Sequence, residues 1–196
     1  LYANADFDLQ PQQLPDHPEI RNLARFFDYE RHFTAETRHA AMAGYFGLTS
    51  FLDDCVGEIL ATLEESGQAE DTVILYLSDH GELLGDKGMW TKQVMYEASA
   101  GIPMILAGPG VPDGILRNTA ASIVDVAATA LDVMLDTSDD SAPGLSLRQL
   151  AQDPDDADRT VLCEYHDGGS TTGAFMVRWG DWKYVCYPGM KRQLFN

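Results

Sequence analysis

The sequence predicts an α/β fold in which a sheet is sandwiched by helices, and three observations support this. Residues 73–77 form an unbroken apolar run of strand length, residues 34–66 carry apolar positions at spacings of three and four, and residues 102–107 form a second apolar run. A continuous apolar strand is typical of a sheet covered on both faces, as in a parallel sheet flanked by helices. We therefore expect residues 72–78 to be a central strand.

Composition limits the classes of partner. The chain has 196 residues, 45% of them hydrophobic, which is enough for one well-packed domain or for part of a larger one. Thirty-one acidic residues against 13 basic ones give a net charge of −18. Because no basic patch is available to neutralise phosphates, and because an acidic membrane surface would repel the chain, we expect neither a nucleic-acid partner nor a membrane partner. An anionic substrate would depend on a bound cation and on nearby lysines.

The cysteines and the chain ends bear on location and completeness. Cys55, Cys163 and Cys186 are an odd number without metal-binding spacing, which predicts reduced or buried thiols. No apolar run approaches the roughly 20 residues that span a bilayer, and no signal peptide is visible. The cytoplasm is favoured over the periplasm as the location. Because the chain begins at Leu1 without methionine and stops at residues 193–196 within an apparent strand, we expect its true ends to lie outside this sequence.

The first 33 residues are predicted to form a surface segment followed by a short helix. Residues 1–17 are rich in proline and polar side chains and have no periodicity, which indicates an extended segment. Pro18 and Glu19 suit the first turn of a helix that would run to about Phe33. His17 and His32 lack a nearby carboxylate or cysteine in the sequence, so we expect them to be solvent-facing or capping residues rather than catalytic ones.

A long helix is predicted from Thr34 to Ser66, ended by Gly67. One of its faces is expected to pack on the sheet. That face consists of Met42, Tyr45, Phe46, Thr49, Leu52, Val56, Ile59, Leu60 and Leu63.

Beyond the second predicted strand, the turn-rich residues 108–114 reverse the chain. A helix then begins at Ser122, whose side chain suits a cap, and runs to about Leu135. Ser146 and Gln149 fit a capping box for a further short helix. The buried face of the first of these helices is expected to consist of Val124, Ala127, Ala128, Leu131, Met134 and Leu135.

The last part of the chain predicts a different kind of sheet. Short β-like runs at 161–165, 174–179 and 182–187 alternate with turn residues, which is typical of a small antiparallel sheet. We therefore divide the chain into an α/β part, residues 1–158, and a small antiparallel β part, residues 159–196.

The strongest candidate site follows the predicted central strand. Asp79 and His80 emerge where Ser78 ends the strand, and Gly81 lets the chain turn away. Ligands of open α/β sheets bind beyond the carboxyl ends of strands. A carboxylate and an imidazole are suited to metal binding, but calcium takes six to eight ligands, so the pair is half of a metal site. Capping of the strand end is the alternative interpretation.

The run from Ser78 to Lys92, SDHGELLGDKGMWTK, resembles the second metal-ligand motif of the sulfatases, which belong to the alkaline phosphatase superfamily. The resemblance covers nearly the whole chain and implies the carboxyl-terminal part of an alkaline-phosphatase-like sheet sandwiched by helices. Further similar stretches are residues 45–57, 97–104, Asp125, 144–147, 182–184 and 193–195.

The resemblance implies a site and a substrate class. Asp79 and His80 would ligate a divalent cation, usually calcium and sometimes manganese, and Lys92 would be the catalytic and substrate-binding residue that contacts the sulfate group. A cation and an ammonium group can stabilise the negative charge that develops during cleavage of a sulfate ester. The expected substrate is a small anionic sulfate or phosphate ester. We also expect self-association into a homo-oligomer, because a partial fold would leave an apolar patch open.

Details of the motif and its absences refine this expectation. Residues 88–92 and 97–99 look closest to choline-sulfatase-like enzymes, with phosphonate monoester hydrolases second, but Gly101 stands where the first group usually has arginine. The family's nucleophile, a cysteine or serine in a Cys/Ser-x-Pro-x-Arg motif that is converted to formylglycine, is absent from the sequence, as are the early paired aspartates. We therefore expect a fragment that alone neither hydrolyses esters nor binds a cation tightly. A non-catalytic structural or interaction module is the alternative.

Overall fold

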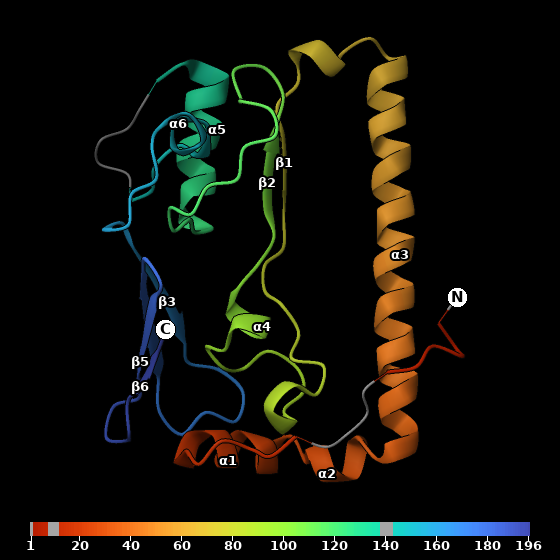
Figure 1. The fold of residues 1–196 in the computed structure, drawn as a ribbon, viewed down its shortest axis with the longest axis vertical. Helices are drawn as coiled ribbons and strands as arrows, with labels where there is room; N and C mark the ends of the chain where they lie inside the picture. Colours follow the sequence, from red (N-terminus) through yellow and green to blue (C-terminus); the bar gives the residue numbers. More distant parts are fainter. Residues whose placement is uncertain (1, 8–11, 138–142) are drawn as a thin grey trace.

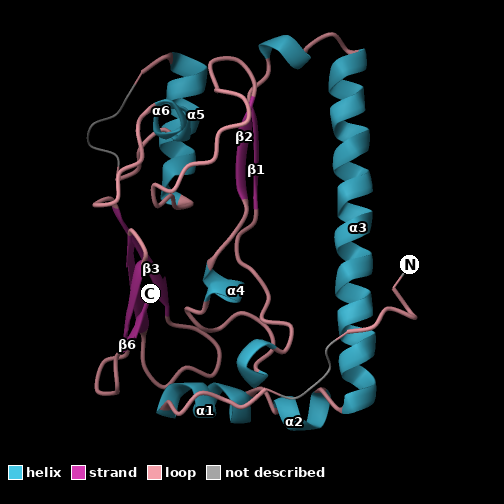
Figure 2. Ribbon diagram, in the orientation of Figure 1, coloured by secondary structure: helices cyan, strands magenta, loops and turns pink. Residues whose placement is uncertain are grey.

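The computed structural model describes residues 2–7, 12–137 and 143–196. Its principal elements are α1 (Pro18–Phe26), α2 (Tyr29–His32), α3 (Ala35–Glu65), β1 (Ile74–Leu77), α4 (Glu97–Ala100), β2 (Met104–Ala107), α5 (Val124–Leu135), α6 (Leu147–Gln152), β3 (Thr160–Tyr165), β4 (Ala174–Trp179), β5 (Trp182–Cys186) and β6 (Gln193–Phe195). Helix α3 stands along one side, β1 and β2 run through the middle, and α5 with α6 lies on the other side (Figure 1). Helices α1 and α2 cross the base, next to the sheet of β3 to β6 (Figure 2). The predicted α/β class is confirmed.

Helix α3 has the predicted length but buries none of its side chains. It begins after Thr34, whose hydroxyl accepts a hydrogen bond from the Thr37 amide at 3.4 Å, and it ends before Gly67, which has a φ of 71°. The packing of its apolar face on a sheet, which the sequence predicts, is not made within the described residues. Exposed side chains of this face and its flanks include Tyr45, Phe46, Leu48, Phe51, Leu52, Ile59 and Leu60.

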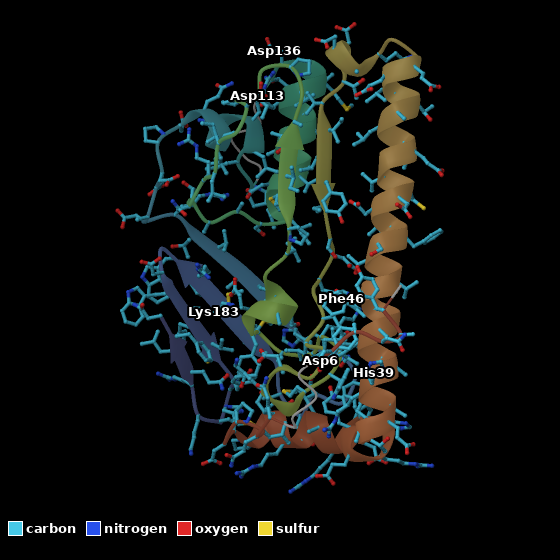
Figure 3. All side chains as sticks on the ribbon, turned by 45° about the vertical axis from the view of Figure 1, so that its right-hand side comes forward. Asp6, His39, Phe46, Asp113, Asp136 and Lys183 are labelled. Carbon is cyan, nitrogen blue, oxygen red and sulfur yellow. The ribbon has the colours of Figure 1, made fainter. Side chains whose placement is uncertain are left out.

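Part of α3 is covered by the amino-terminal segment. The rings of Phe7 and Phe46 stack with their centroids 5.4 Å apart. The Nε2 atom of His39 lies 3.1 Å from the carbonyl oxygen of Ala5. Figure 3 places Phe46 and His39 on the helix close to Asp6 of this segment. The segment therefore lies along the lower turns of α3 and leaves the upper turns uncovered.

Strands β1 and β2 form a two-stranded antiparallel sheet in which Tyr76 lies opposite Ile105. Both predicted strands exist, each shorter than its apolar run. The predicted central place of residues 72–78 is wrong within the described part of the chain, because β2 is the only strand that pairs with β1 there and it runs antiparallel. Neither strand has a buried side chain, and Ile105 is 59% exposed. An apolar run predicts that a strand needs cover, but it does not say which segment supplies it.

The carboxyl-terminal sheet confirms the predicted antiparallel arrangement, with the order β3-β4-β5-β6. The two-residue turn at 180–181 brings Trp179 opposite Trp182. One face of the sheet is buried and consists of Ala174, Met176 and Val185, with Lys183 beside them at 6% exposure. A buried lysine on an apolar face requires a specific partner, which the candidate site provides.

The main core lies at the base, where α1 and α2 pack against the chain that follows β1. Apolar positions three and four residues apart in α1 point into it, as the helical period requires. The buried members are Ile20, Leu23, Ala24, Tyr29, Leu83, Met89, Trp90, Val94 and Tyr96. The loop that carries the predicted lysine is therefore built on a packed core.

Contacts also join the two ends of the described chain. The side chain of His17 is 2% exposed, its Nε2 atom lies 2.8 Å from the Lys191 carbonyl oxygen, and its ring lies 4.4 Å from that of Tyr187. The predicted solvent-facing or capping role of His17 is therefore wrong, because the segment between β5 and β6 covers it and its side chain makes no cap. The carboxylate of Glu19, also buried, accepts a hydrogen bond from the Thr171 amide at 2.8 Å.

Helix α5 buries a polar stripe rather than the predicted apolar one. Asp125 and Thr129 are its buried residues, whereas Val124, Met134 and Leu135 are exposed. Asp125 is satisfied by an ion pair with Arg159 at 2.6 Å and by the amides of Ser122 and Leu145 at 2.8 and 2.9 Å. These partners explain why the polar side of α5 faces inward, and two of them, Leu145 and Arg159, come from segments distant in sequence.

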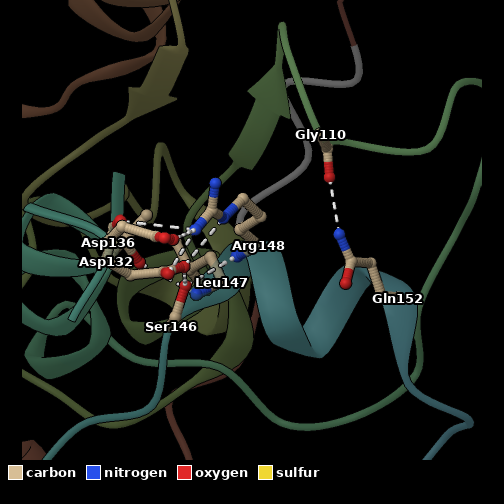
Figure 4. Close-up of polar contacts among 8 residues, drawn as sticks. Gly110, Asp132, Asp136, Ser146, Leu147, Arg148 and Gln152 are labelled. Carbon is tan, nitrogen blue, oxygen red and sulfur yellow. Dashed lines mark hydrogen bonds and ion pairs between the residues drawn. The ribbon is translucent and has the colours of Figure 1, made fainter. Parts of the chain in front are cut away.

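Helices α5 and α6 are joined by an ion-pair network (Figure 4). The guanidinium of Arg148 binds the carboxylate of Asp132, and the hydroxyl of Ser146 donates to the same carboxylate. These hydrogen bonds, led by the one from Arg148, lower the pKa of Asp132. Ser146 also caps α6 as predicted, since its hydroxyl accepts from the Arg148 amide at 3.2 Å. Gln152 donates to the carbonyl oxygen of Gly110 at 2.7 Å and so ties α6 to the turn-rich loop.

The three cysteines are free thiols of intermediate exposure, as the sequence predicts. Among the helices that the structure describes, none is both long and apolar enough to cross a membrane.

Candidate functional site

The candidate site begins where β1 ends. The carboxylate of Asp79 accepts a hydrogen bond from the His80 amide at 3.0 Å, and the Ser78 hydroxyl donates to the His80 carbonyl oxygen at 2.8 Å. The amide of Gly81 then donates to the Ser99 carbonyl oxygen at 2.7 Å. A Cβ atom at Gly81 would fall inside van der Waals contact of the Ala98 carbonyl, so only glycine lets the turn lie this close to α4.

The imidazole of His80 is oriented so that one nitrogen is available to a ligand. Its Nδ1 atom lies 2.9 Å from the Gly81 carbonyl oxygen, which can only accept, so Nδ1 carries the proton and Nε2 carries the lone pair. Nε2 lies 3.3 Å from the Asp79 carboxylate and accepts a hydrogen bond from the Lys92 ammonium group. A backbone carbonyl that holds the distal nitrogen is the usual support of a metal-binding histidine.

Lys92 is delivered by a loop with a fixed backbone. The Glu82 carboxylate accepts hydrogen bonds from the amides of Leu84 and Thr91 at 3.1 and 2.6 Å, which closes the loop across its neck. Thr91 has a φ of 68°, a conformation that is rare outside glycine and asparagine. The buried hydroxyl of Tyr29 donates to the Trp90 carbonyl oxygen at 2.5 Å and so holds this conformation from below. The core therefore fixes the main chain immediately before Lys92.

Asp79, His80 and Lys92 all line one open cleft of about 750 Å³ between the end of β1 and the carboxyl-terminal sheet. Lys183 and Arg178 reach the same cleft from β5 and β4, and Glu97 reaches it from α4. Figure 3 shows Lys183 on the sheet beside α4. The buried ammonium group of Lys183 binds the Glu97 carboxylate, and a guanidinium nitrogen of Arg178 lies 3.6 Å from the same carboxylate.

The surroundings of the cleft lower the pKa values of two carboxylates, Asp79 and Glu97. Removal from water alone would raise the pKa of Asp79, but the hydrogen bond from the His80 amide, with the nearby charge of Lys92, outweighs this and lowers the pKa. The hydrogen bond from Lys183, with the charge of Arg178, lowers the pKa of Glu97. Both carboxylates are therefore negatively charged at neutral pH.

The structure thus brings all three predicted site residues together. It also brings in Glu97, Ser99 and Lys183, to which the sequence assigns no role in the site. No pattern in the sequence pairs Glu97 with Lys183, 86 residues away, and a lone serine after an acidic residue is too common to single out. The best sequence signal for these residues is Lys183, because it is the one charged residue in the otherwise apolar strand β5.

The described residues hold only part of a metal site. No group of three or more histidine, cysteine, aspartate or glutamate side chains in the described part of the chain could enclose an ion. The Asp79 carboxylate and His80 Nε2 are the two donors at hand. The chemistry of this pair fits a divalent cation, because a carboxylate oxygen and a supported imidazole nitrogen are both ligand types, and the Lys92 ammonium already lies where a positive charge is favourable.

Comparison with known proteins gives the family. The family model described as Sulfatase matches residues 15–137, which is more than half of the chain. The chain belongs to the sulfatase family. The resemblance predicted from residues 78–92 is therefore confirmed.

Individual sulfatases and related enzymes align over most of this chain. A choline-sulfatase from Rhizobium meliloti (strain 1021) is 34% identical over 182 residues, which are 91% of this chain and 35% of that protein. Arylsulfatase K from Danio rerio is 32% identical over 84% of this chain and 33% of its own length. A phosphonate monoester hydrolase from Silicibacter pomeroyi has a similar solved structure, with a TM-score of 0.81, 25% identity, and coverage of 99% of this chain and 46% of its own. The chain spans about a third of the length of the two curated relatives.

Proposed function

We propose that residues 1–196 are the carboxyl-terminal part of a metal-dependent sulfatase that hydrolyses small anionic sulfate esters. The observation that supports this most directly is the meeting of Asp79, His80 and Lys92 in one cleft, within a chain of the sulfatase family. The relatives have two to three times the length of this chain, and we place the remaining parts of the active site in the polypeptide outside residues 1–196.

In this proposal Lys92 binds the sulfate group of the substrate. Its ammonium group has three N–H donors, and His80 Nε2 accepts one of them. Nε2 can serve one partner at a time, so when it ligates a cation the Lys92 donors are free for a sulfate oxygen. An ammonium held beside the transferring group stabilises the negative charge that develops there, and the anchored loop avoids the cost of reorganising it during reaction.

Asp79 and His80 would hold the divalent cation, calcium by preference and manganese as the alternative. A bound divalent cation supplies electrostatic stabilisation of negatively charged oxygen atoms. Calcium takes six to eight ligands, and the described residues of this chain offer two in the cleft, so we place the other protein ligands elsewhere in the polypeptide, together with the formylglycine nucleophile. The role of this chain is to fix the two ligands: the Gly81 carbonyl orients the ring of His80, and the His80 amide orients the carboxylate of Asp79.

Hydrolysis of phosphonate or phosphate esters is the second candidate. It is favoured by the similarity of the solved phosphonate monoester hydrolase structure along 99% of this chain. A non-catalytic structural or interaction module is the third. The polypeptide upstream of Leu1 distinguishes it, because a Cys/Ser-x-Pro-x-Arg motif there supports an enzyme and its absence supports a module.

The test uses the full-length protein, meaning the longer polypeptide that contains residues 1–196, with Lys92→Ala as the variant. We expect turnover of an aryl sulfate to fall by about 10²–10³-fold, the usual loss on removing one donor to a developing negative charge. The matched control is Lys87→Ala, which removes a lysine of the same loop that pairs with Asp86. Chelation of the metal should abolish turnover, and addition of calcium or manganese should restore it.

Three results would count against the proposal. Full activity in Lys92→Ala would show that Lys92 does not take part in the reaction. Full activity after complete chelation would show that the reaction does not need a cation. A higher kcat/KM for an aryl phosphonate monoester than for the matching sulfate would replace the first candidate with the second.

A further inference from the structure

The single turn of helix α4 contacts both the Gly81 turn and the Lys92 loop of the candidate site. Ser99, which is 2% exposed, uses its hydroxyl to donate a hydrogen bond to the carbonyl oxygen of Lys92. Its own carbonyl oxygen accepts from the Gly81 amide at 2.7 Å, directly after the Asp79–His80 pair. One buried residue therefore holds both arms of the site, although the two arms are separated by 12 residues along the chain.

The other side of α4 is attached to the carboxyl-terminal sheet. Glu97 binds the buried Lys183 of β5, and the amide nitrogen of the Gln193 side chain donates to the hydroxyl of Tyr96 at 3.1 Å. Met95 belongs to the buried cluster of that sheet. The side chain of Glu97 also lies over Gly101, where a Cβ atom would come within 2.8 Å of its carboxylate oxygen. The glycine at 101 therefore leaves room for Glu97 in the place it takes against the sheet.

We propose that Ser99 is a positioning residue of the reaction, which sets the distance between Lys92 and the Asp79–His80 pair, and that Glu97 and Lys183 hold α4 in place for this purpose. This inference rests on the proposed function, because it assigns Ser99 an effect exerted through Lys92. A side chain that aligns a catalytic group matters because displacements of about 1 Å can cost about 10²-fold in rate. The sheet of β3 to β6 then contributes to catalysis as the support of α4.

The experiment combines Ser99→Ala and Lys92→Ala in the full-length protein, singly and together. Loss of the Ser99 hydroxyl should lower kcat by about 10- to 100-fold and change KM by less than about threefold, because the bond aligns Lys92 without touching substrate. In the Lys92→Ala background the same substitution should cause no further loss, since residues that act as a unit are not additive. A purely structural role of Ser99 would instead lower kcat by the same factor in both backgrounds, which would overturn the inference.

Two further variants serve as controls. Ser66→Ala removes a similar bond, from a serine hydroxyl to the Leu63 carbonyl oxygen at the end of α3, and should leave kcat unchanged. Ser99→Thr keeps the donor and should retain most of the turnover. If Ser99→Ala does not fold, Glu97→Gln replaces it, because the Glu97 side chain is 69% exposed and glutamine keeps its size and an oxygen that can accept from the buried Lys183 ammonium group. Glu97→Gln should lower kcat several-fold with Lys92 present and have no effect with Lys92→Ala.

Amide hydrogen exchange separates this inference from the proposed function. Ser99→Ala should speed exchange about tenfold at residues 91–93, because only the hydroxyl bond to the Lys92 carbonyl oxygen is lost. It should leave α5 and the Gly81 amide unchanged, because that amide is bound by the main-chain carbonyl oxygen of Ser99, which the substitution keeps. If the wild-type protein hydrolyses neither sulfate nor phosphonate esters, the proposed function fails, and exchange still decides whether the Ser99 hydroxyl holds the Lys92 arm. Unchanged exchange at residues 91–93 would overturn the inference whatever the activity.

Discussion

In the carboxyl-terminal sheet Ala174, Met176 and Val185 are buried, whereas the two-stranded sheet of β1 and β2 has no buried side chain. Strands β1 and β2 are wholly apolar, and the carboxyl-terminal sheet also contains charged and polar residues, so the difference in burial comes from what covers each sheet. The first receives Met95 and the chain around α4, and the second lies between α3 and α5 without being enclosed by either (Figure 1). Apolar strands gain stability when other segments cover them, and the described residues cover β1 and β2 incompletely.

The candidate site depends on both sheets. Asp79 and His80 extend from the poorly covered strand β1, but Gly81 and Lys92 are tied through α4 to the well-covered sheet. The comparison therefore indicates that the described residues fix the geometry of the site from one side only.

The largest expected effect is on turnover, when residues 1–196, with the poorly covered sheet of β1 and β2, are studied without the rest of the polypeptide. Residues 1–196 alone should turn over an aryl sulfate at least about 10³-fold more slowly than the full-length protein, because the nucleophile and most metal ligands are proposed to lie elsewhere. Both proteins would be assayed with calcium or manganese. A rate near that of the full-length protein would show that residues 1–196 contain the whole active site.

The next effect compares one side chain from each sheet. In residues 1–196, Met176→Ala should lower the free energy of unfolding by about 2–4 kcal/mol, because it leaves a cavity in a packed cluster. Ile105→Ala, at a 59% exposed position, should change it by about 0.5 kcal/mol or less. Urea unfolding of both variants measures the difference.

The variants Met176→Ala and Ile105→Ala can also be compared in the full-length protein, where they test whether other segments cover β2. If other segments cover β2 there, Ile105→Ala should cost about 2 kcal/mol or more, close to the cost of Met176→Ala. Equal, small costs of Ile105→Ala in both proteins would mean that β2 stays open in the complete molecule.

The smallest effect concerns the link between α4 and the covered sheet. Lys183 and Arg178, the charged groups that face Glu97, lower its pKa, so its charged form stabilises the fold above its unfolded pKa of about 4.5. This stabilisation should be lost as the pH falls through the lower pKa of the folded protein. The melting temperatures of the wild type and of Glu97→Gln should therefore differ at pH 7 and converge in acid. A difference that persists at the lowest pH at which both remain folded would contradict this origin.

Much of the local structure was predictable because it depends on neighbours in sequence. The start of α3 at Thr34 and its end before Gly67 follow from capping chemistry, and the carboxyl-terminal hairpin follows from alternation around residues 180–181. The site residues Asp79, His80 and Lys92 were predictable because their motif is continuous. Their meeting in one cleft agrees with that motif.

The features that the sequence did not predict depend on contacts between segments distant in sequence. The inward face of α5 is polar because Arg159 lies against Asp125, 34 residues away, and no pattern within the helix contains that information. The partner of β1 could not be predicted from its apolar run, which is compatible with either a parallel or an antiparallel neighbour. The same reasoning explains why Ser99 was missed, since its importance comes from the two arms that it joins.

The contacts between the first and last segments set the order in which this molecule can be assembled. His17 reaches the Lys191 carbonyl oxygen, and Tyr96 receives both a hydrogen bond from Gln193 and an edge-on contact from Phe195 at 5.9 Å. During synthesis these contacts of the base and of α4 can form only after residues 191–195 have left the ribosome. The loop that carries Lys92 therefore gains this support late relative to its own synthesis, and a polypeptide released before residue 193 would lack it.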